Sequence, residues 1–112
     1  MRLLSLNEEA VLLAIWKLGE GAYPVTIMER VNRMMGRDMV YGTLYNTLDN
    51  LLKKECVASE KGDPTPERGG KRKVFFTLTD KGVDALRRNH LMHASIWEGA
   101  GDFFAEKDRS QR

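Results

Sequence analysis

The chain of 112 residues is long enough for one hydrophobic core but too short for two, and its 42% hydrophobic and 30% charged residues are typical of a folded globular domain. No apolar run reaches the roughly 18 residues of a membrane-spanning helix, and the first residues lack the pattern of a secretory signal. We therefore expect a cytoplasmic protein without membrane association. The formal net charge of +2 is too small to indicate nucleic-acid binding by itself.

The first predicted helix covers residues 7–18, because Asn7 is a good N-cap residue and two acidic residues follow it. Between Ala10 and Leu18 the only charged residue is Lys17, so this helix is apolar on nearly all sides. Burial on two sides implies contact with a partner. A second short helix follows, with Pro24 at its first position and Gly36 as its C-terminal stop.

The third predicted helix spans residues 40–54 and has an unusual polar face. Leucines and tyrosines lie on one side, and short polar side chains lie on the other. A solvated face is the alternative interpretation, but such faces are rich in Lys, Arg and Glu, and none occurs between Val40 and Leu52. In a helix-turn-helix the second helix enters the major groove of DNA, where Asn can pair with adenine. The residues predicted to read bases are Thr43, Asn46, Thr47 and Asn50.

A glycine such as Gly42 at the start of this helix lowers helix stability by roughly 1 kcal/mol relative to alanine. The presence of glycine at this position therefore needs an explanation. Close approach to a DNA phosphate is one reason, and a tight start to the helix is an equally good one. We expect Gly42 near the DNA backbone.

After Cys56 the pattern becomes extended, with strands at residues 56–61 and 71–78 on either side of a Gly- and Pro-rich loop. Between Lys61 and Lys73, five basic residues face two acidic ones, so this hairpin is the electrostatic candidate for phosphate contact. Strand alternation allows only two or three contacts among the four predicted cations. The four cations predicted to contact phosphates are Arg68, Lys71, Arg72 and Lys73. The lone cysteine forms no internal disulfide and has no metal-ligand spacing, so we expect it to be a small apolar strand residue.

Thr79 caps a last predicted helix that runs to about Phe104. Its apolar and aromatic residues alternate at spacings of three and four, as in a coiled-coil seam, and together with the first helix they predict a homodimer. The expected interface or effector-cavity residues are Leu12, Trp16, Leu86, His90, His93, Trp97 and Phe104. His90 and His93 could instead bind a metal or sense pH, but without a third ligand we expect interface packing and neither a metal nor a cofactor. The aromatic residues, with Phe103, either pack or line a cavity for a planar apolar effector.

The order of elements predicts a mainly α fold with a small β-hairpin: a winged helix-turn-helix in residues 1–78, a dimerisation helix in residues 79–106 and a frayed tail in residues 107–112. Cysteine and histidine cannot be assembled with a base and an orienting group at recognisable spacing, so we expect no enzyme. Binding to double-stranded DNA is the leading hypothesis. A winged-helix protein-interaction module without DNA binding is the alternative.

Three segments resemble the PadR-like transcriptional regulators: GAYPVTIMERV at residues 21–31, YGTLYNTLDNLLKKE at residues 41–55 and PERGGKRKVFFTLTDKG at residues 66–82. The resemblance covers about residues 3–90, and it fits the short form of the family without an additional C-terminal domain. The sequence departs from many relatives at Tyr23-Pro24 and at the end of the third helix, which alters turns but not the reading face.

The resemblance implies a dimeric regulator, usually a repressor, whose third helix reads an inverted repeat while the wing holds the DNA backbone. The family motif carries over to the Gly-Thr-Leu-Tyr start of the third helix and to the Gly-Gly-basic-basic-basic run of the wing. It places Gly42, Tyr45, Gly69 and Gly70 near the DNA backbone. Similar short members dimerise through their first and last helices, and some bind aromatic or other apolar effectors there that lower DNA affinity.

Overall fold

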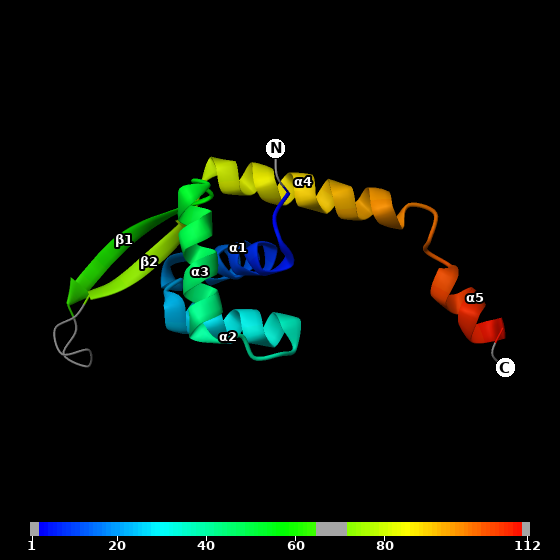
Figure 1. The fold of residues 1–112 in the computed structure, drawn as a ribbon, viewed down its shortest axis with the longest axis horizontal. Helices are drawn as coiled ribbons and strands as arrows, with labels where there is room; N and C mark the ends of the chain where they lie inside the picture. Colours follow the sequence, from blue (N-terminus) through cyan, green and yellow to red (C-terminus); the bar gives the residue numbers. More distant parts are fainter. Residues whose placement is uncertain (1–2, 65–71, 111–112) are drawn as a thin grey trace.

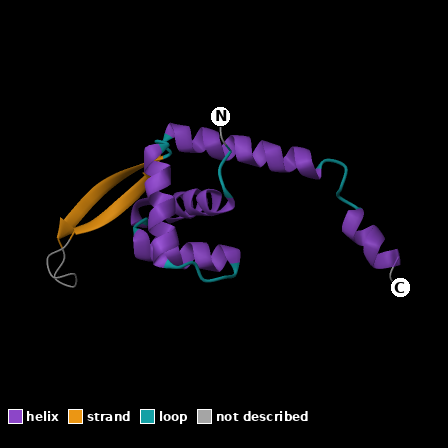
Figure 2. Cartoon of the chain, in the orientation of Figure 1, coloured by secondary structure: helices purple, strands orange, loops and turns teal. Residues whose placement is uncertain are grey.

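The computed structural model describes residues 3–64 and 72–110 and confirms a winged helix-turn-helix (Figures 1 and 2). Three helices are followed by an antiparallel hairpin and by two further helices. In chain order, the elements are α1 (Leu6–Leu18), a 3₁₀ turn (Gly19–Gly21), α2 (Pro24–Met35), α3 (Tyr41–Lys53), β1 (Val57–Pro64), β2 (Arg72–Leu78), α4 (Asp80–Trp97) and α5 (Phe103–Ser110). The fold is mainly α with one small hairpin, as predicted.

The first helix begins at Leu6 and not at Asn7. Ser5 is its N-cap, and the Ser5 hydroxyl accepts a hydrogen bond from the Glu8 backbone N–H at 3.1 Å while the Glu8 carboxylate accepts one from the Ser5 N–H at 2.8 Å. This reciprocal capping box satisfies two backbone donors, which a cap by Asn7 alone would not. The Ser-x-x-Glu spacing is visible in the sequence and could have corrected the prediction.

The second helix has the predicted ends. Pro24 lies in its first turn, and Gly36 ends it with the left-handed φ of 66° that favours glycine. The short connection to α3 is held by Asn32, whose side-chain oxygen accepts a hydrogen bond from the Met39 N–H at 2.8 Å. The α2–α3 pair is therefore a rigid helix-turn-helix.

The core lies between α1, α2 and α3 and extends to the base of the hairpin at Cys56, Val57 and Phe76. Leu12 is 0% exposed within this core, so the prediction that it lies at a dimer interface or in an effector cavity needs correction, because the rest of the chain covers it completely. The remaining apolar face of α1 is more exposed, and Trp16 retains 65% of its surface. The largest fully buried aliphatic residues are Val11, Leu12, Ile15, Ile27, Val31, Leu44, Leu48 and Leu51.

The hairpin is attached to the helical body at its base. The β1 and β2 strands pair antiparallel from Val57↔Leu78 to Lys61↔Val74, and the Phe76 N–H donates a hydrogen bond to the Ala22 carbonyl at 2.8 Å. The Phe75 ring also meets the Tyr23 ring edge-on, with 5.6 Å between centroids. The outer part of the hairpin extends away from the helices (Figure 1).

The last helices differ from the predicted continuous helix. Thr79 caps α4 as expected, and its hydroxyl accepts from the Gly82 N–H at 3.1 Å. The helix ends at Trp97, where Glu98 leaves the helical conformation and Gly99 has a φ of 77°. Phe104 therefore belongs to the separate helix α5, and residues 107–110, predicted to be a frayed tail, are helical. The physical reason is the flexible Gly-Ala-Gly segment at residues 99–101, which breaks the helix.

Asn89 fastens α4 to the first residues of the chain. This side chain is 1% exposed, accepts a hydrogen bond from the Leu4 N–H at 3.0 Å and donates one to the Leu4 carbonyl at 3.2 Å. A buried amide that satisfies both backbone groups of one residue fixes the position of the helix without leaving an unpaired polar atom.

The buried carboxylate of Glu8 makes stability depend on pH. Burial alone would raise the pKa of Glu8, but hydrogen bonds from the Lys54 ammonium at 2.6 Å and from the Ser5 N–H outweigh it and lower this pKa below its ordinary value of 4.5. Because the pKa is lowered in the folded state, the stabilisation is complete above the unfolded-state pKa and is lost as pH falls through the folded-state pKa.

We expect Glu8→Gln to lower the free energy of unfolding by roughly 2 kcal/mol at pH 7 and by less at pH 3.5, because the stabilisation from a carboxyl whose pKa is lowered on folding declines once the pH is below its unfolded-state pKa. Urea unfolding at the two pH values measures the difference. Glu20→Gln is the matched control, because Glu20 is exposed and forms no ion pair within residues 3–64 and 72–110. An equal loss for Glu8→Gln at both pH values would contradict the role of the charge.

Candidate nucleic-acid interface

The N-terminal end of α3 is an exposed surface on the opposite side of the molecule from α4 (Figure 1). Leu44, Leu48 and Leu51 anchor the helix in the core, while Tyr41 and Tyr45 are about half exposed. The two tyrosine rings lie next to each other, with 6.2 Å between centroids. Core packing thus presents the first two turns of α3 outward, which is how a recognition helix is presented to a DNA groove.

The polar face of α3 is narrower than predicted. Asn46 is exposed, and Thr43 and Asn50 are half-buried. Thr47 is only 5% exposed, and its hydroxyl donates a hydrogen bond to the Thr43 carbonyl at 2.7 Å. The prediction that Thr47 reads bases therefore needs correction: it lies at the edge of the apolar face, and its hydroxyl is used by the preceding helical turn.

Gly42 lies on this surface with free space around it. A Cβ added there would meet nothing within 4 Å among residues 3–64 and 72–110, and the φ of Gly42 is outside the left-handed region. The chain itself therefore supplies neither a steric nor a conformational reason for glycine. This removes the tight helix start as an explanation.

The described part of the wing carries two of the predicted cations, which differ in their surroundings. Arg72 is exposed at the start of β2, whereas Lys73 is half-buried with its Nζ atom 4.3 Å from the centre of the Tyr23 ring. That cation–π contact holds Lys73 against the body of the protein. The other predicted wing residues, Arg68, Gly69, Gly70 and Lys71, lie outside the described residues.

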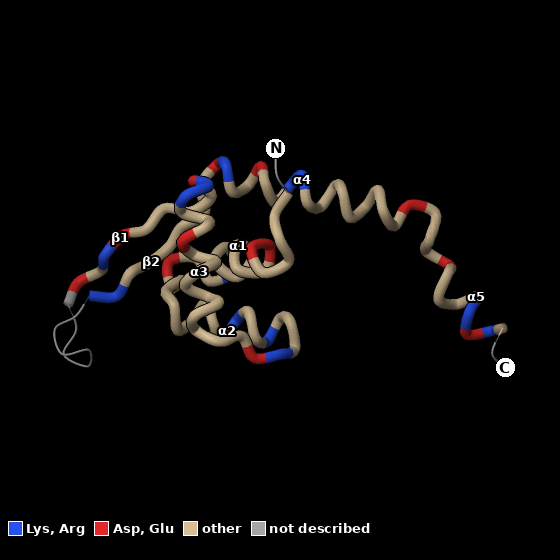
Figure 3. Tube along the Cα trace, viewed as in Figure 1, with Lys and Arg blue, Asp and Glu red and all other residues tan. Residues whose placement is uncertain are grey.

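Additional basic residues, which we did not predict, flank the start of α3. Arg33 near the end of α2 and Arg37 just after it are exposed, and Arg37 shares the lining of a cavity of about 240 Å³ with Val40 and Thr43. Figure 3 shows Lys and Arg near the end of α2 and at the outer end of the hairpin. Arg30 and Arg33 are three residues apart and share one face of α2, while Arg37 follows the Gly36 stop; the cluster of basic residues around the predicted turn is visible in the sequence.

The residues predicted for a dimer or effector site lie along α1, α4 and α5. Leu86 and His90 line a groove of about 400 Å³ between α4 and α1. The His93 ring lies 3.2 Å from the Glu9 carboxylate, and His93 is exposed. Trp97 and Phe104 are more than half exposed and lie 5.7 Å apart between ring centroids. The predicted partner contacts of these residues stay predictions.

Within residues 3–64 and 72–110, no cluster of three or more His, Cys, Asp or Glu side chains could hold a metal ion. In the same part of the chain, none of the helices has the length and apolar character required to cross a bilayer.

An exposed recognition helix that carries no Lys, Arg or Glu before Lys53, beside a hairpin with an exposed arginine, defines the winged helix-turn-helix class of DNA-binding proteins. The chain belongs to the transcriptional regulator PadR-like family, whose sequence model matches residues 12–88. The protein is therefore a DNA-binding transcriptional regulator.

Solved structures show the same fold at low sequence identity. A PadR-like transcription factor from Bacteroides fragilis is 23% identical with a TM-score of 0.71 over 86% of this chain and 87% of its own. The hsRosR-S1 complex of H. salinarum RosR is 21% identical, with a TM-score of 0.68 over 97% of this chain and 96% of its own. Bordetella bronchiseptica BpsR is 16% identical, with a TM-score of 0.60 over 96% of this chain and 80% of its own. The DNA binding of BpsR is regulated by 6-hydroxynicotinic acid. A search of curated protein sequences finds no match.

Proposed function

We propose that the protein is a repressor that binds an inverted repeat in duplex DNA as a homodimer and is released by a small apolar effector. The observation that carries the DNA-binding part is the exposed start of α3, where the uncharged Asn46 and the open Gly42 lie on one surface. Asn46 is placed to read a base edge in the major groove, with Thr43 and Asn50 beside it. Arg72 of the wing, with Arg33 and Arg37, would contact phosphates and position the protein.

The dimer proposal rests on apolar surface that the single chain leaves uncovered. Along α4 and α5, Leu91, Ile96, Trp97, Phe103 and Phe104 are each between 48% and 67% exposed. The second half of α4 projects beyond the helical body (Figure 1), so its own subunit cannot cover it. Large apolar side chains exposed along one helical arm favour an interface, and the groove between α1 and α4 can accommodate a helix of the second subunit.

The effector proposal rests on the aromatic cluster at the end of α4. Trp97, Phe103 and Phe104 have neighbouring ring centroids 5.5–5.7 Å apart. Flat aromatic walls suit a planar apolar ligand. The ligand-regulated DNA binding stated for BpsR, a structural neighbour of this chain, supports the same idea.

Selection from a library of random duplexes tests the operator directly. We expect the full chain to enrich an inverted repeat whose half-site centres are about one helical turn apart, roughly 10–10.5 base pairs, as a symmetric dimer requires. Binding should weaken with salt, because each phosphate contact releases counterions. Enrichment of a single half-site, or of no sequence, would contradict the proposal.

Two variants distinguish a residue that contacts bases from a residue that contacts phosphates when the protein binds the selected duplex. Asn46→Ala should lower affinity for it about tenfold and leave binding to a scrambled duplex unchanged, since one base contact contributes about 1–3 kcal/mol of discrimination. Arg72→Gln should weaken binding to both duplexes equally, and it should reduce the salt dependence of the affinity by about one released counterion. Arg109→Gln is the control, because it removes the same charge from the exposed end of α5. Equal behaviour of the three variants would contradict the assignment.

A further inference from the structure

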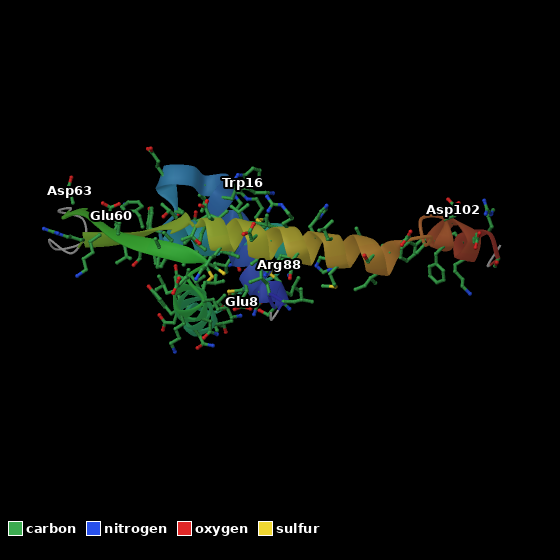
Figure 4. The ribbon with its side chains drawn as sticks, turned by 90° about the horizontal axis from the view of Figure 1, so that it is seen from above. Glu8, Trp16, Glu60, Asp63, Arg88 and Asp102 are labelled. Carbon is green, nitrogen blue, oxygen red and sulfur yellow. The ribbon has the colours of Figure 1, made fainter. Side chains whose placement is uncertain are left out.

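The outer half of the hairpin stands clear of the helical body. Figure 4 shows Glu60 and Asp63 of β1 on the part of the hairpin that projects beyond the helices. At its base, the hairpin is fixed by the buried Phe76 side chain and by the hydrogen bond from the Phe76 N–H to the Ala22 carbonyl at 2.8 Å. A two-stranded hairpin has little stability of its own, so the direction of its outer half depends on side-chain contacts with the helices.

Tyr23, the N-cap residue of α2, contacts the wing through two side chains of β2. The Phe75 ring meets the Tyr23 ring edge-on, with 5.6 Å between centroids and 71° between ring planes, and the Lys73 Nζ atom lies 4.3 Å from the centre of the Tyr23 ring. Lys73 and Phe75 are two residues apart in a strand, so their side chains leave the same face of β2. We call Tyr23, Lys73 and Phe75 the wing clamp.

The Phe75 ring is also packed against β1. A Cβ added at Gly62 would lie 2.6 Å from a carbon of the Phe75 ring, so this ring occupies the space that a side chain at position 62 would take. The register of the two strands shifts at the same place, between Lys61 and Pro64. Phe75 therefore connects both strands of the wing to the start of α2.

The backbone of Tyr23 is itself held in place. The Tyr23 N–H donates a hydrogen bond to the Thr26 hydroxyl oxygen at 3.1 Å, and the Tyr23 carbonyl accepts one from the Ile27 N–H at 2.8 Å. The far end of α2 is joined to α3 by the hydrogen bond between Asn32 and the Met39 N–H. The Tyr23 ring thus has a fixed place relative to the recognition helix.

We propose that Tyr23 is the positioning residue of the wing: its ring holds Lys73 and Phe75 and so sets the direction in which Arg72 reaches the DNA while α3 lies in the major groove. By strand alternation, Arg72 lies on the opposite face of β2 from the other two, and it is exposed. Lys73 then acts through Tyr23 and not on a phosphate. The DNA part of this inference rests on the proposed phosphate contact of Arg72, whereas the orientation of the wing does not.

Residual dipolar couplings of the full ¹⁵N-labelled chain test the orientation without DNA. In the wild type, one alignment tensor should fit α1–α3 and both strands. In Tyr23→Leu, which has no ring face, residues 60–64 and 72–75 should no longer fit the tensor of the helices, while Tyr23→Phe should behave as the wild type because a phenyl ring keeps both contacts. The couplings of α1–α3 report whether each variant is folded. A single tensor that still fits helices and strands in Tyr23→Leu would overturn the proposal.

Salt dependence on the selected duplex tests the effect on DNA binding. Tyr23→Leu removes no charge, yet it should reduce the salt dependence as Arg72→Gln does: for each subunit, one phosphate contact fewer makes the affinity fall about 3.5-fold less between 50 and 200 mM salt. Adding Tyr23→Leu to Arg72→Gln should cause no further loss, and Tyr23→Phe should keep the wild-type salt dependence. An unchanged salt dependence of Tyr23→Leu would overturn the positioning role. If Arg72→Gln itself leaves the salt dependence unchanged, the phosphate contact of the proposed function fails, and the dipolar couplings still decide the orientation.

Lys73→Met distinguishes the wing clamp from a direct phosphate contact of Lys73, because methionine keeps an apolar stem but removes the charge. Lys73→Met and Tyr23→Leu together should lower affinity no more than either change alone. Independent losses that multiply would show that Lys73 contacts DNA and would contradict its place in the wing clamp. Lys107→Met is the matched control, because the Lys107 Nζ atom also lies over an aromatic ring, 5.8 Å from the centre of the Phe103 ring, but belongs to α5. This control should bind DNA as the wild type does.

Discussion

Replacing Gly42 with leucine is expected to weaken binding to the selected operator at least tenfold while leaving the free energy of unfolding unchanged or higher. Leucine has a better helix propensity than glycine by somewhat under 1 kcal/mol, and a Cβ at this position meets nothing within 4 Å among the residues that the structure describes. If DNA approaches the backbone here, the new side chain occupies the space of a phosphate or sugar. A tenfold loss corresponds to about 1.4 kcal/mol of binding free energy.

Two measurements on the same variant separate the explanations for this glycine. Urea unfolding reports the stability, and titration of the operator duplex reports the affinity. Gly101→Leu is the matched control, because Gly101 also has open space and a φ outside the left-handed region but lies between α4 and α5. Wild-type DNA affinity of Gly42→Leu would show that the start of α3 does not approach the DNA backbone.

Gly82→Ala is expected to have the opposite effect, a large loss of stability. A Cβ at Gly82 would overlap the backbone carbonyl oxygen of Cys56 and lie 2.7 Å from a methyl carbon of Leu78. That carbonyl also accepts a hydrogen bond from the Thr79 N–H at 3.1 Å, so it cannot move without disturbing the cap of α4. Overpacking against a fixed backbone atom costs roughly 3 kcal/mol.

The surroundings of Gly82 explain why the strain cannot be relieved locally. The Thr79 hydroxyl donates to the Glu55 carbonyl at 2.6 Å, and Glu55 has a φ of 60°, the only such value for a non-glycine residue in residues 3–64 and 72–110. The end of α3, the start of β1 and the start of α4 are therefore tied at one point. Urea unfolding measures the loss, with Gly101→Ala as control, and a loss below about 1 kcal/mol would contradict this close contact.

Local signals in the sequence predicted most elements of the fold. Pro24 and Gly36 marked the ends of α2, and Thr79 marked the start of α4, because the first and last turns of a helix leave backbone groups that only certain residues satisfy. The last helix was predicted to run to about Phe104, but it is interrupted at Gly99 and Gly101. The flexible backbone of these glycines ends α4 near Trp97 and allows a separate α5.

The candidate site was predicted less completely than the fold, since exposure depends on neighbours that are distant in the sequence. The 100° spacing placed Thr47 beside Asn46 on the polar face, but packing turned Thr47 into the helix surface that the core covers. Lys73 was grouped with Arg72 by charge alone, and only the fold brought its ammonium over the Tyr23 ring.

By itself, the sequence determined the order of elements, the lack of Lys, Arg and Glu on the outer face of α3 before Lys53, and the basic character of the wing, because periodicity, caps and charge are local properties of the chain. Only the tertiary structure decided that Leu12 belongs to the core of its own subunit, that Gly42 is open while Gly82 is enclosed, and that Tyr23 contacts both Lys73 and Phe75. These outcomes depend on which helices pack together, and burial of side chains between distant segments is set by that packing and not by the spacing of residues along one helix.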